Sequence, residues 1–453
     1  RRRRRKIGEM TTPKFVFKSV HTDEVIESSA EWFRLGQQFP SGAKVANVEY
    51  PDGYGVLPEL LMNSSELRND MWRYFDLMPI ANRDNIVTNG EGAPPIHRWK
   101  FLEDYARRLG ISCTIYAHRW DDSYSTGTWK DLSGALVASG LKESGVTDYV
   151  AASTGNIGVS LSCYLTKAGI AFYAFIPESS SFAQEAELGV FGQAVYRVNG
   201  DYTCAKNMAA KFAEVHGYAL TAGTFDPFRI EAKKTMAFEW ARVLPQAPTV
   251  YVQALSGGTG PIGVAKGCRE LQAAALLEHL PRLLLVQSDR CAPMAQGWEA
   301  AVSDGFPDGW EKRFPVIESP ETEIATLATG NPAAYPLLAP VVRETGGHIF
   351  SVREEFAMEI AKLVAAETSV RIGPAAAIGV QGLFAALRSG RISDGDVVVL
   401  NVGEGMRRSP GFMRSLVRKA GVVEDLADCE PFDRKSYIRR LWERVAAEFD
   451  PAD

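Results

Sequence analysis

The sequence predicts an α/β protein with two doubly wound parallel-sheet domains, an N-terminal extension and a C-terminal helical tail. Three observations support this prediction. Strand-like and helix-like segments alternate over most of the chain, which favours a parallel sheet covered by helices on both faces. Polar or Gly-rich loops follow three strand-like segments, where open α/β sheets bind ligands. At 453 residues the chain is too long for one ordinary hydrophobic core.

The expected elements follow in chain order. Residues 10–84 hold short strand-like pieces and turn clusters, which we interpret as an extension wrapped on the main body. The elements expected up to residue 215 are helix 99–109, strand 113–117, strand 149–152, helix 157–168, strand 171–176, helix 182–191, strand 195–198 and helix 203–215. Those expected after it are helix 228–243, strand 250–253, helix 261–276, strands 283–287 and 396–400, and a tail helix near 434–448.

From this order we expect four parts. They are an N-terminal extension (10–84), a large domain (85–130 and 226–420), a small domain (131–225) and a C-terminal tail (421–453).

Composition narrows the functional class. A charged fraction of 23% and a hydrophobic fraction of 46% are typical of soluble globular proteins, and no apolar run reaches the roughly 20 residues of a membrane span. The net charge of -5 argues against a nucleic-acid partner. We interpret the basic run at residues 1–6 as an expression remnant or a disordered arm, with a native basic tail as the alternative. Six isolated cysteines without a Cys-x-x-Cys pair argue against structural zinc and favour a cytoplasmic setting.

Lys130 is the residue around which a site is expected. It follows the turn formers at 125–127 and opens a helix that becomes small and apolar. Burial of a lysine on such an element disfavours its charged form, and a neutral amine can form a Schiff base with an aldehyde cofactor. A solvated lysine in the first turn of a helix is the alternative.

Two loops have the pattern of anion sites. The first lies between a strand and a helix, so that unpaired N–H groups of the helix start can bind a carboxylate; it contains Ser153, Thr154, Gly155 and Asn156. The second can hold a phosphate with backbone amides and a hydroxyl; it contains Ser256, Gly257, Gly258, Thr259 and Gly260. An ordinary capped helix and a plain βα turn are the respective alternatives.

The last strand also leads into polar residues. Asn401 and Glu404 follow it at the expected carboxyl-end edge of the sheet, where either side chain could face a ring nitrogen. In the alternative interpretation Glu404 pairs with Arg407 at the surface.

In sequence order these segments resemble the fold type II family of pyridoxal phosphate enzymes, the tryptophan synthase β-like enzymes. The threonine synthase branch is most similar. Its Pro-Thr-Gly-Ser-Phe-Lys-Asp-Arg resembles residues 125–132, its Ser-Thr-Gly-Asn-Thr-Gly resembles 153–158, and its Asn-Pro-x-Arg-x-Glu-Gly-x-Lys-Thr resembles 226–235. Gly330-Asn331-Pro332 also fits, and the likeness covers about 85–410.

The chain departs from threonine synthases at two places. Leu132 replaces an arginine, and residues 401–405 read Asn-Val-Gly-Glu-Gly where those enzymes have Leu-Thr-Gly-His-Gly. The phosphate loop and the end of the last strand look more like the cysteate synthase subgroup. Those enzymes replace the phosphate of phosphoserine with sulfite on a route to coenzyme M.

The resemblance implies a role for each candidate residue. Lys130 would bind pyridoxal 5'-phosphate and act as the catalytic base. Residues 153–156 would bind the substrate carboxylate, with Asn156 also near the phenolic oxygen of the cofactor, and 256–260 would bind its phosphate. Asn401 or Glu404 would face its ring nitrogen. The candidates for a substrate oxyanion are Arg119 and Arg229, for which a surface ion pair is the alternative.

The implied activity is a β- or γ-elimination or replacement on an amino acid with a phosphate, thioether or sulfonate side chain. Threonine synthase and a Ser/Thr dehydratase-like deaminating lyase are the alternatives. The implied setting is a cytoplasmic homodimer in amino acid metabolism, including coenzyme M biosynthesis, with no metal, membrane or nucleic-acid partner. A dinucleotide-dependent oxidoreductase on a similar α/β sheet and a cofactor-free binding protein of the same fold are the competing classes, and neither would have the yellow colour of a lysine–pyridoxal phosphate aldimine.

Overall fold

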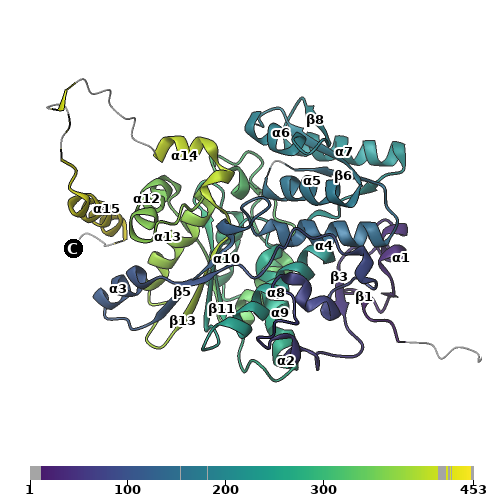
Figure 1. The fold of residues 1–453 in the computed structure, drawn as a ribbon, viewed down its shortest axis with the longest axis horizontal. Helices are drawn as coiled ribbons and strands as arrows, with labels where there is room; N and C mark the ends of the chain where they lie inside the picture. The colour runs from purple at the N-terminus through teal and green to yellow at the C-terminus, as the bar shows by residue number, and fades with distance from the viewer. Residues whose placement is uncertain are drawn as a thin grey trace, which may run out of the picture.

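Two largely parallel sheets form the framework of the protein (Figure 1). The structure is a computed structural model that describes residues 12–153, 155–180, 182–416, 425–426, 429 and 431–449. The larger sheet has the strand order β12 (His348–Val352), β11 (Arg282–Ser288), β10 (Val250–Ala254), β13 (Val397–Val402), β5 (Thr114–Arg119) and β4 (Ile96–Arg98). The smaller sheet has the order β8 (Ala194–Val198), β7 (Ala171–Pro177), β6 (Asp148–Ala152) and β9 (Ala219–Leu220).

The helices cover both sheets. Those of the first half of the chain are α1 (Ser29–Arg34), α2 (Leu57–Leu60), α3 (Lys100–Arg108), α4 (Lys130–Glu143), α5 (Asn156–Ala168), α6 (Phe182–Gly189) and α7 (Tyr202–His216). Those of the second half are α8 (Pro227–Val243), α9 (Thr259–Ala273), α10 (Pro293–Ser303), α11 (Tyr335–Glu344), α12 (Ala357–Thr368), α13 (Pro374–Arg388), α14 (Pro410–Leu416) and α15 (Arg434–Phe449).

The central strand of the larger sheet shows why its sequence is apolar throughout. Every residue of β13 is buried. Val398 and Leu400 pack with the core that contains α12 and α13, whereas Val399 packs with the core that contains α8 and α9. Since successive side chains of a strand point to opposite faces, the sheet is covered on both sides, as the alternation of elements predicted.

The smaller sheet is covered in the same way. Val150 of β6 packs with Ala205 and Ala209 of α7, while the flanking Tyr149 and Ala151 belong to the core that contains α4 and α5. In Figure 1 this unit lies at the upper right and the larger sheet at the lower left. Helix α4 runs between α5 and α8, so the lysine at its first residue lies where the two sheets approach each other.

The N-terminal segment forms a small antiparallel sheet of β1 (Val16–Ser19), β2 (Val25–Ile26) and β3 (Ala46–Glu49). It docks on α8, which its strand β3 contacts. Phe17 packs against Phe228 with ring centroids 5.7 Å apart, and the Tyr50 hydroxyl donates to the buried Glu231 carboxylate at 2.7 Å. The extension therefore helps to fix the helix that carries Arg229.

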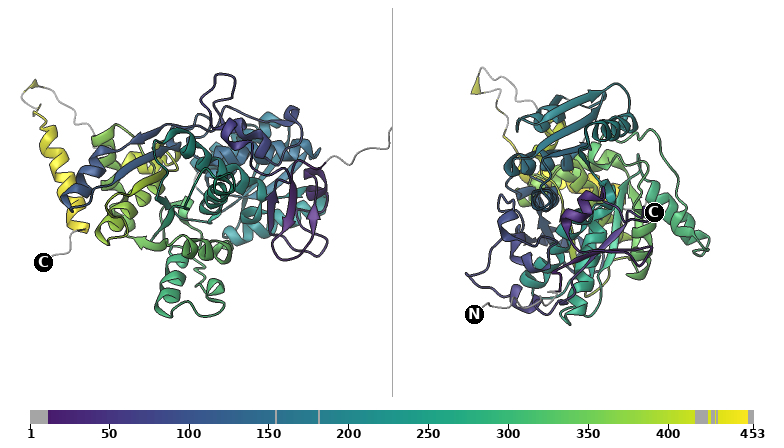
Figure 2. Two further views of the ribbon diagram at one scale, coloured as in Figure 1. Left: turned by 90° about the horizontal axis from the view of Figure 1, so that it is seen from below. Right: turned by 90° about the vertical axis from the view of Figure 1, so that its right-hand side faces the viewer.

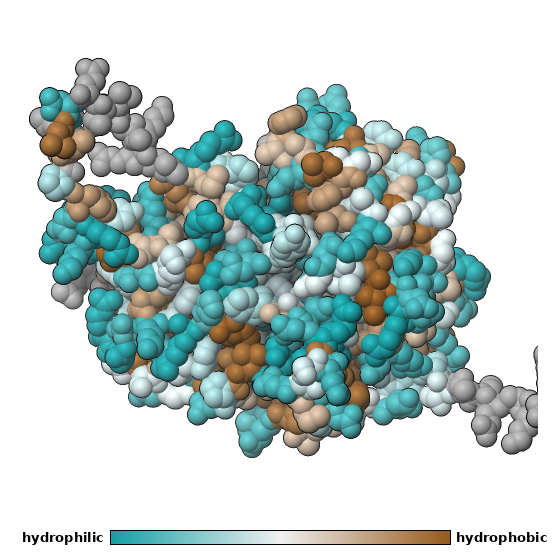
Figure 3. Space-filling model, viewed as in Figure 1, coloured by the Kyte–Doolittle hydropathy of each residue, from teal (hydrophilic) through white to brown (hydrophobic). Residues whose placement is uncertain are grey.

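At the other end, α15 packs beside α12 and α13 (Figure 2). Leu441 and Val445 are buried there, and Trp442 stacks on Tyr105 at 5.7 Å. The surface in Figure 3 is mostly hydrophilic, with small separate hydrophobic patches. Among the described residues no helix is long and apolar enough to cross a membrane, and no group of three or more His, Cys, Asp or Glu side chains could hold a metal ion.

Candidate functional site

Three neighbouring parallel strands bring three of the expected segments to one edge of the larger sheet. Strand β13 pairs with β10 on one side and β5 on the other, in parallel register. The lysine loop follows β5, residues 403–405 follow β13, and the Gly-rich loop follows β10. Since the carboxyl ends of parallel strands meet at one edge, the fold brings these segments together.

The lysine loop is held in place by its own residues and by the last strand. The carboxylate of Asp131 accepts hydrogen bonds from the Thr126 backbone N–H at 3.1 Å and hydroxyl at 2.6 Å. The Trp129 N–H donates to the Gly403 carbonyl at 3.1 Å. These bonds fix the chain on both sides of Lys130, so its position depends little on the flexibility of the turn.

Lys130 carries an amine that is easily deprotonated. Its Nζ lies 4.5 Å from the Trp129 ring centroid, and no described residue forms a hydrogen bond or ion pair with it. The pKa of Lys130 is lowered to about 8, mainly by burial and also by the Arg229 cation, while the Glu404 carboxylate acts in the opposite direction. A substantial neutral fraction near neutral pH is what attack on an aldehyde requires.

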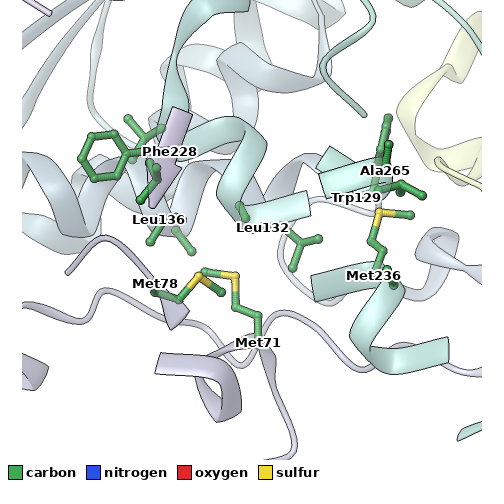
Figure 4. Packing of buried hydrophobic residues seen from close by; sticks show 14 of the residues in the cluster. Met71, Met78, Trp129, Leu132, Leu136, Phe228, Met236 and Ala265 are labelled. Carbon is green, nitrogen blue, oxygen red and sulfur yellow. The ribbon is translucent and has the colours of Figure 1, made fainter. Parts of the chain in front are cut away.

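Trp129 forms one wall of the site, a role that the sequence analysis did not assign. A Cβ on Gly260 would lie 2.1 Å from Cη2 of this indole, and a Cβ on Gly403 would lie 3.2 Å from its Nε1. Figure 4 shows the ring beside Met236 and Ala265. The indole therefore spans from the Gly-rich loop to the end of the last strand.

The Gly-rich loop has free donors for an anion. The N–H groups of Ser256, Gly257 and Gly258 donate to no acceptor within the described part of the chain. Thr259 and Gly260 begin α9, where the first N–H groups lack intrahelical acceptors. These donors, at the positive end of a helix, fit the phosphate of the expected cofactor.

Asn401 and Glu404 differ in what they can still bind. Both are buried, but Asn401 Oδ1 has no hydrogen-bond partner among the described residues. Glu404 instead accepts from the Ala375 N–H at 3.1 Å and from Asn156 Nδ2 at 2.5 Å, and burial raises its pKa. The alternative in which Glu404 pairs with Arg407 at the surface is therefore wrong. An unpaired buried oxygen at Asn401 fits a protonated ring nitrogen.

The loop after β6 meets the same edge from the smaller sheet. Asn156 is the first residue of α5, and its side chain bridges to the larger sheet, donating to Glu404 and accepting from Arg408 Nε at 2.9 Å. Ser153 is buried and Gly155 is the N-cap of α5. Thr154 lies outside the described residues. The fold thus brings Asn156 to the lysine edge, and the role of residues 153–156 in binding a carboxylate stays a prediction.

The two arginines are not equivalent. Arg229 donates through Nη2 to Thr221 Oγ1 at 2.9 Å, and its Nε lies 3.6 Å from Asp226 Oδ2 without a hydrogen-bond partner. Its charge acts on Lys130. It is the arginine with free donor capacity beside the lysine.

Arg119 is bound to carboxylates. It makes two hydrogen bonds to Asp121, at 2.7 and 2.8 Å, and one to Asp122 at 3.0 Å, and its Nη1 contacts His97 at 3.1 Å. No interaction links it to Lys130 or Arg229 in the described residues. We therefore retain only Arg229 as a candidate for a substrate oxyanion.

The sequence analysis also missed Lys233, whose Nζ lies 5.6 Å from the Trp129 ring centroid. It lies in the segment that resembles Asn-Pro-x-Arg-x-Glu-Gly-x-Lys-Thr, at a position that this motif leaves open. The pair of adjacent lysines, Lys233 and Lys234, in a long helix was the available signal.

Comparisons with known proteins identify similar chains. The model of the family described as pyridoxal-phosphate dependent enzyme matches residues 87–403. The threonine synthase of Methanocaldococcus jannaschii is 27% identical over 348 residues, which cover 76% of this chain and 82% of that protein. The threonine synthase of Halalkalibacterium halodurans is 26% identical over 345 residues, which cover 76% of this chain and 90% of that protein.

Solved structures share the fold. Diaminopropionate ammonia lyase from Escherichia coli superposes with a TM-score of 0.59 at 16% identity, covering 73% of this chain and 88% of that one. Maize serine racemase superposes with a TM-score of 0.58 at 16% identity, covering 71% of this chain and 92% of that one.

Proposed function

Because this chain belongs to the family of pyridoxal-phosphate dependent enzymes, as a lyase or synthase, we propose that it catalyses elimination or replacement at the β- or γ-carbon of an amino acid with an anionic or thioether side chain. A phosphate or a sulfonate is the favoured leaving or incoming group. The observation that carries this proposal is Arg229, whose Nε makes no hydrogen bond and whose positive charge lowers the pKa of the lysine amine.

The residues at the sheet edge have the donors and acceptors that the cofactor needs. We assign its aldehyde to Lys130, its phosphate to the N–H groups of 256–260, and its ring nitrogen to Asn401 Oδ1. One N–H of the Asn156 amide donates to Glu404, and the other remains for the phenolic oxygen. When bound, pyridoxal phosphate supplies an electron sink for negative charge at the substrate α-carbon.

Lys130 also suits the role of base. An amine with a pKa of about 8 is near the pH at which a general base works best, because enough of it is neutral to accept a proton. The first turn of α5 offers N–H groups to the substrate carboxylate, which orients the α-proton toward the lysine. Such positioning can supply several kcal/mol of the barrier reduction, roughly up to 7–11 in the best cases.

Threonine synthase is the second candidate. The relatives named above are threonine synthases that match three quarters of this chain. Against it stands the edge after the last strand, where Asn401, Val402 and Glu404 replace the leucine, threonine and histidine of the motif. A deaminating lyase would use the same site but release a keto acid.

A substrate screen tests the proposal. The purified protein is incubated with phosphoserine, phosphohomoserine, cysteine thioethers and cysteate, with and without sulfite, and visible spectra, phosphate release, keto acid and sulfonated product are measured. We expect turnover of at least one anionic substrate. Threonine formed from phosphohomoserine would establish the second candidate, and cofactor binding without any product would indicate a silent binding protein.

Lys130 is tested separately by borohydride reduction and peptide mapping. The pyridoxyl group should be found on Lys130 and should be absent after Lys130→Ala. Label on Lys233 or Lys234 would refute the assignment.

The cytoplasmic location and the homodimer are also proposals. All six cysteines are free thiols, as a reducing compartment favours. Cell fractionation and light scattering of the purified protein test the two statements.

A further inference from the structure

Lys233 is a buried lysine without a counter-ion. Its Nζ donates to Ser133 Oγ at 2.8 Å, to the Arg229 carbonyl at 3.1 Å and to Thr259 Oγ1 at 3.3 Å, all of them neutral acceptors. The next residue shows the contrast, since the buried Lys234 lies between the carboxylates of Glu231 and Glu270. Among the described residues no carboxylate oxygen lies within ion-pair distance of Lys233.

Its surroundings are short of negative charge. Burial lowers the pKa of Lys233 most, the cations of Lys130 and Arg229 lower it further, and only Asp226 opposes them. Burying an unpaired ammonium costs several kcal/mol. A neutral side chain would fill the same space without this cost, so packing alone does not explain a lysine here.

Thr259 connects this cation to the phosphate loop. It is the first residue of α9, and its neighbours 256–258 carry the free N–H groups described above. A hydroxyl that accepts from an ammonium keeps its own hydrogen for another acceptor. That hydrogen and the loop N–H groups are donors of one anion site.

We propose that Lys233 supplies the positive charge for the phosphate of pyridoxal phosphate, acting through the Thr259 hydroxyl that it contacts. The inference rests on the proposed function and assigns to this chain a phosphate-positioning residue outside the Gly-rich loop. Its charge compensates the phosphate dianion where the loop alone offers only N–H groups.

The test compares two ligands that differ only in the phosphate. Equilibrium dissociation constants of pyridoxal phosphate and of pyridoxal are measured by visible absorbance for wild type, Lys233→Met, Lys233→Gln and Thr259→Val. We expect Lys233→Met to weaken pyridoxal phosphate roughly 10- to 100-fold, the range for a charge-assisted contact, and to change pyridoxal binding by less than about threefold. Lys233→Gln, which keeps a donor but not the charge, should lose a similar amount.

Two controls separate this role from a structural one. Lys14→Met removes a partly buried lysine, whose Nζ donates to the Phe75 and Ile80 carbonyls, and should leave both constants unchanged. Thr259→Val should show the same ligand selectivity, and its combination with Lys233→Met should add little, because the two residues act in series. Thr259→Val also keeps the proposal testable if the Lys233 variants do not fold.

The outcomes are distinct. Equal weakening of both ligands, or no weakening of pyridoxal phosphate, overturns the assignment of Lys233. If Lys233→Met changed only the KM of anionic substrates, the lysine would contact the substrate and not the cofactor phosphate, and the assignment would also be overturned. Wild-type protein that binds neither ligand would refute the proposed function itself, whereas normal binding by wild type and Lys233→Met alike refutes only this inference.

Discussion

Replacing Gly258 by alanine should destabilise the protein even before any ligand is bound. Gly258 has φ +88°, and the left-handed region costs an L-residue roughly 1–2 kcal/mol. The new Cβ would lie 3.2 Å from Ala334 Cβ and 3.3 Å from Leu338 Cδ2, closer than relaxed carbon contacts of about 3.5–4.0 Å. Adding about 1 kcal/mol for this crowding, we expect the free energy of unfolding to fall by about 2–3 kcal/mol.

Gly257→Ala is the matched control in the same loop. Gly257 does not have a positive φ, and the nearest atom to its new Cβ is Thr224 Oγ1 at 3.8 Å. We expect its free energy of unfolding to change by no more than about 0.5 kcal/mol.

Urea unfolding of the two cofactor-free variants, with unchanged denaturant slopes, measures the difference directly. Equal midpoints for the two variants would show that the strain assigned to Gly258 is absent.

Three further predictions follow from single side chains. Arg229→Ala should weaken binding of anionic amino acids by about 1.5–3 kcal/mol and leave alanine binding unchanged, as measured by spectral titration; equal losses would assign Arg229 to the fold or to the carboxylate site. The rate at which pyridoxal attaches to Lys130 should rise with pH through a midpoint near 8, the pKa of this lysine. Arg229→Met should raise the midpoint, because the guanidinium lowers the pKa of Lys130. An unshifted midpoint in the variant would contradict the effect assigned to Arg229. Burial lowers the pKa of His118 to about 3, so the unfolded chain binds a proton at a higher pH than the folded chain does. The free energy of unfolding should therefore fall by up to about 1.4 kcal/mol per pH unit as pH falls from about 6.5 to 3. His118→Gln should flatten that slope in pH-dependent unfolding, and identical slopes for the variant and wild type would refute this prediction.

The sequence predicted the elements whose signal is local. The strand before the lysine, the helix that Lys130 opens and the loops at 153–156 and 256–260 all combine an apolar run with turn residues at its end. Such patterns depend on neighbouring residues only, so tertiary contacts do not change the elements that they predict.

Elements without a clear period were not predicted. Strand β12 and helices α10 to α13 lie in a region of apolar runs that suit a helix or a strand equally. Strand β9 has two residues, and β4 pairs antiparallel to β5 at the sheet edge, where tertiary packing decides. The division into four parts at residues 84, 130, 225 and 420 stays a prediction.

The contacts between candidate residues needed the fold. Asn156 and Glu404 are 248 positions apart and follow strands of different sheets, yet their side chains are hydrogen-bonded. The unpartnered Oδ1 of Asn401 likewise depends on the fold, whereas the ion pairs of Arg119 are with Asp121 and Asp122, two and three positions away. A single sequence shows which side chains are available but not which of them are already engaged.

The contact between Trp129 and Gly260 bears on how related chains can diverge. A Cβ at position 260 would overlap the indole, whereas the smaller phenylalanine of the threonine synthase motif would leave more room at that end of the ring. Alanine at 260 is therefore compatible with a smaller ring at 129 and incompatible with tryptophan. Across a set of homologous sequences these two positions, 131 residues apart in the chain, should vary as a pair.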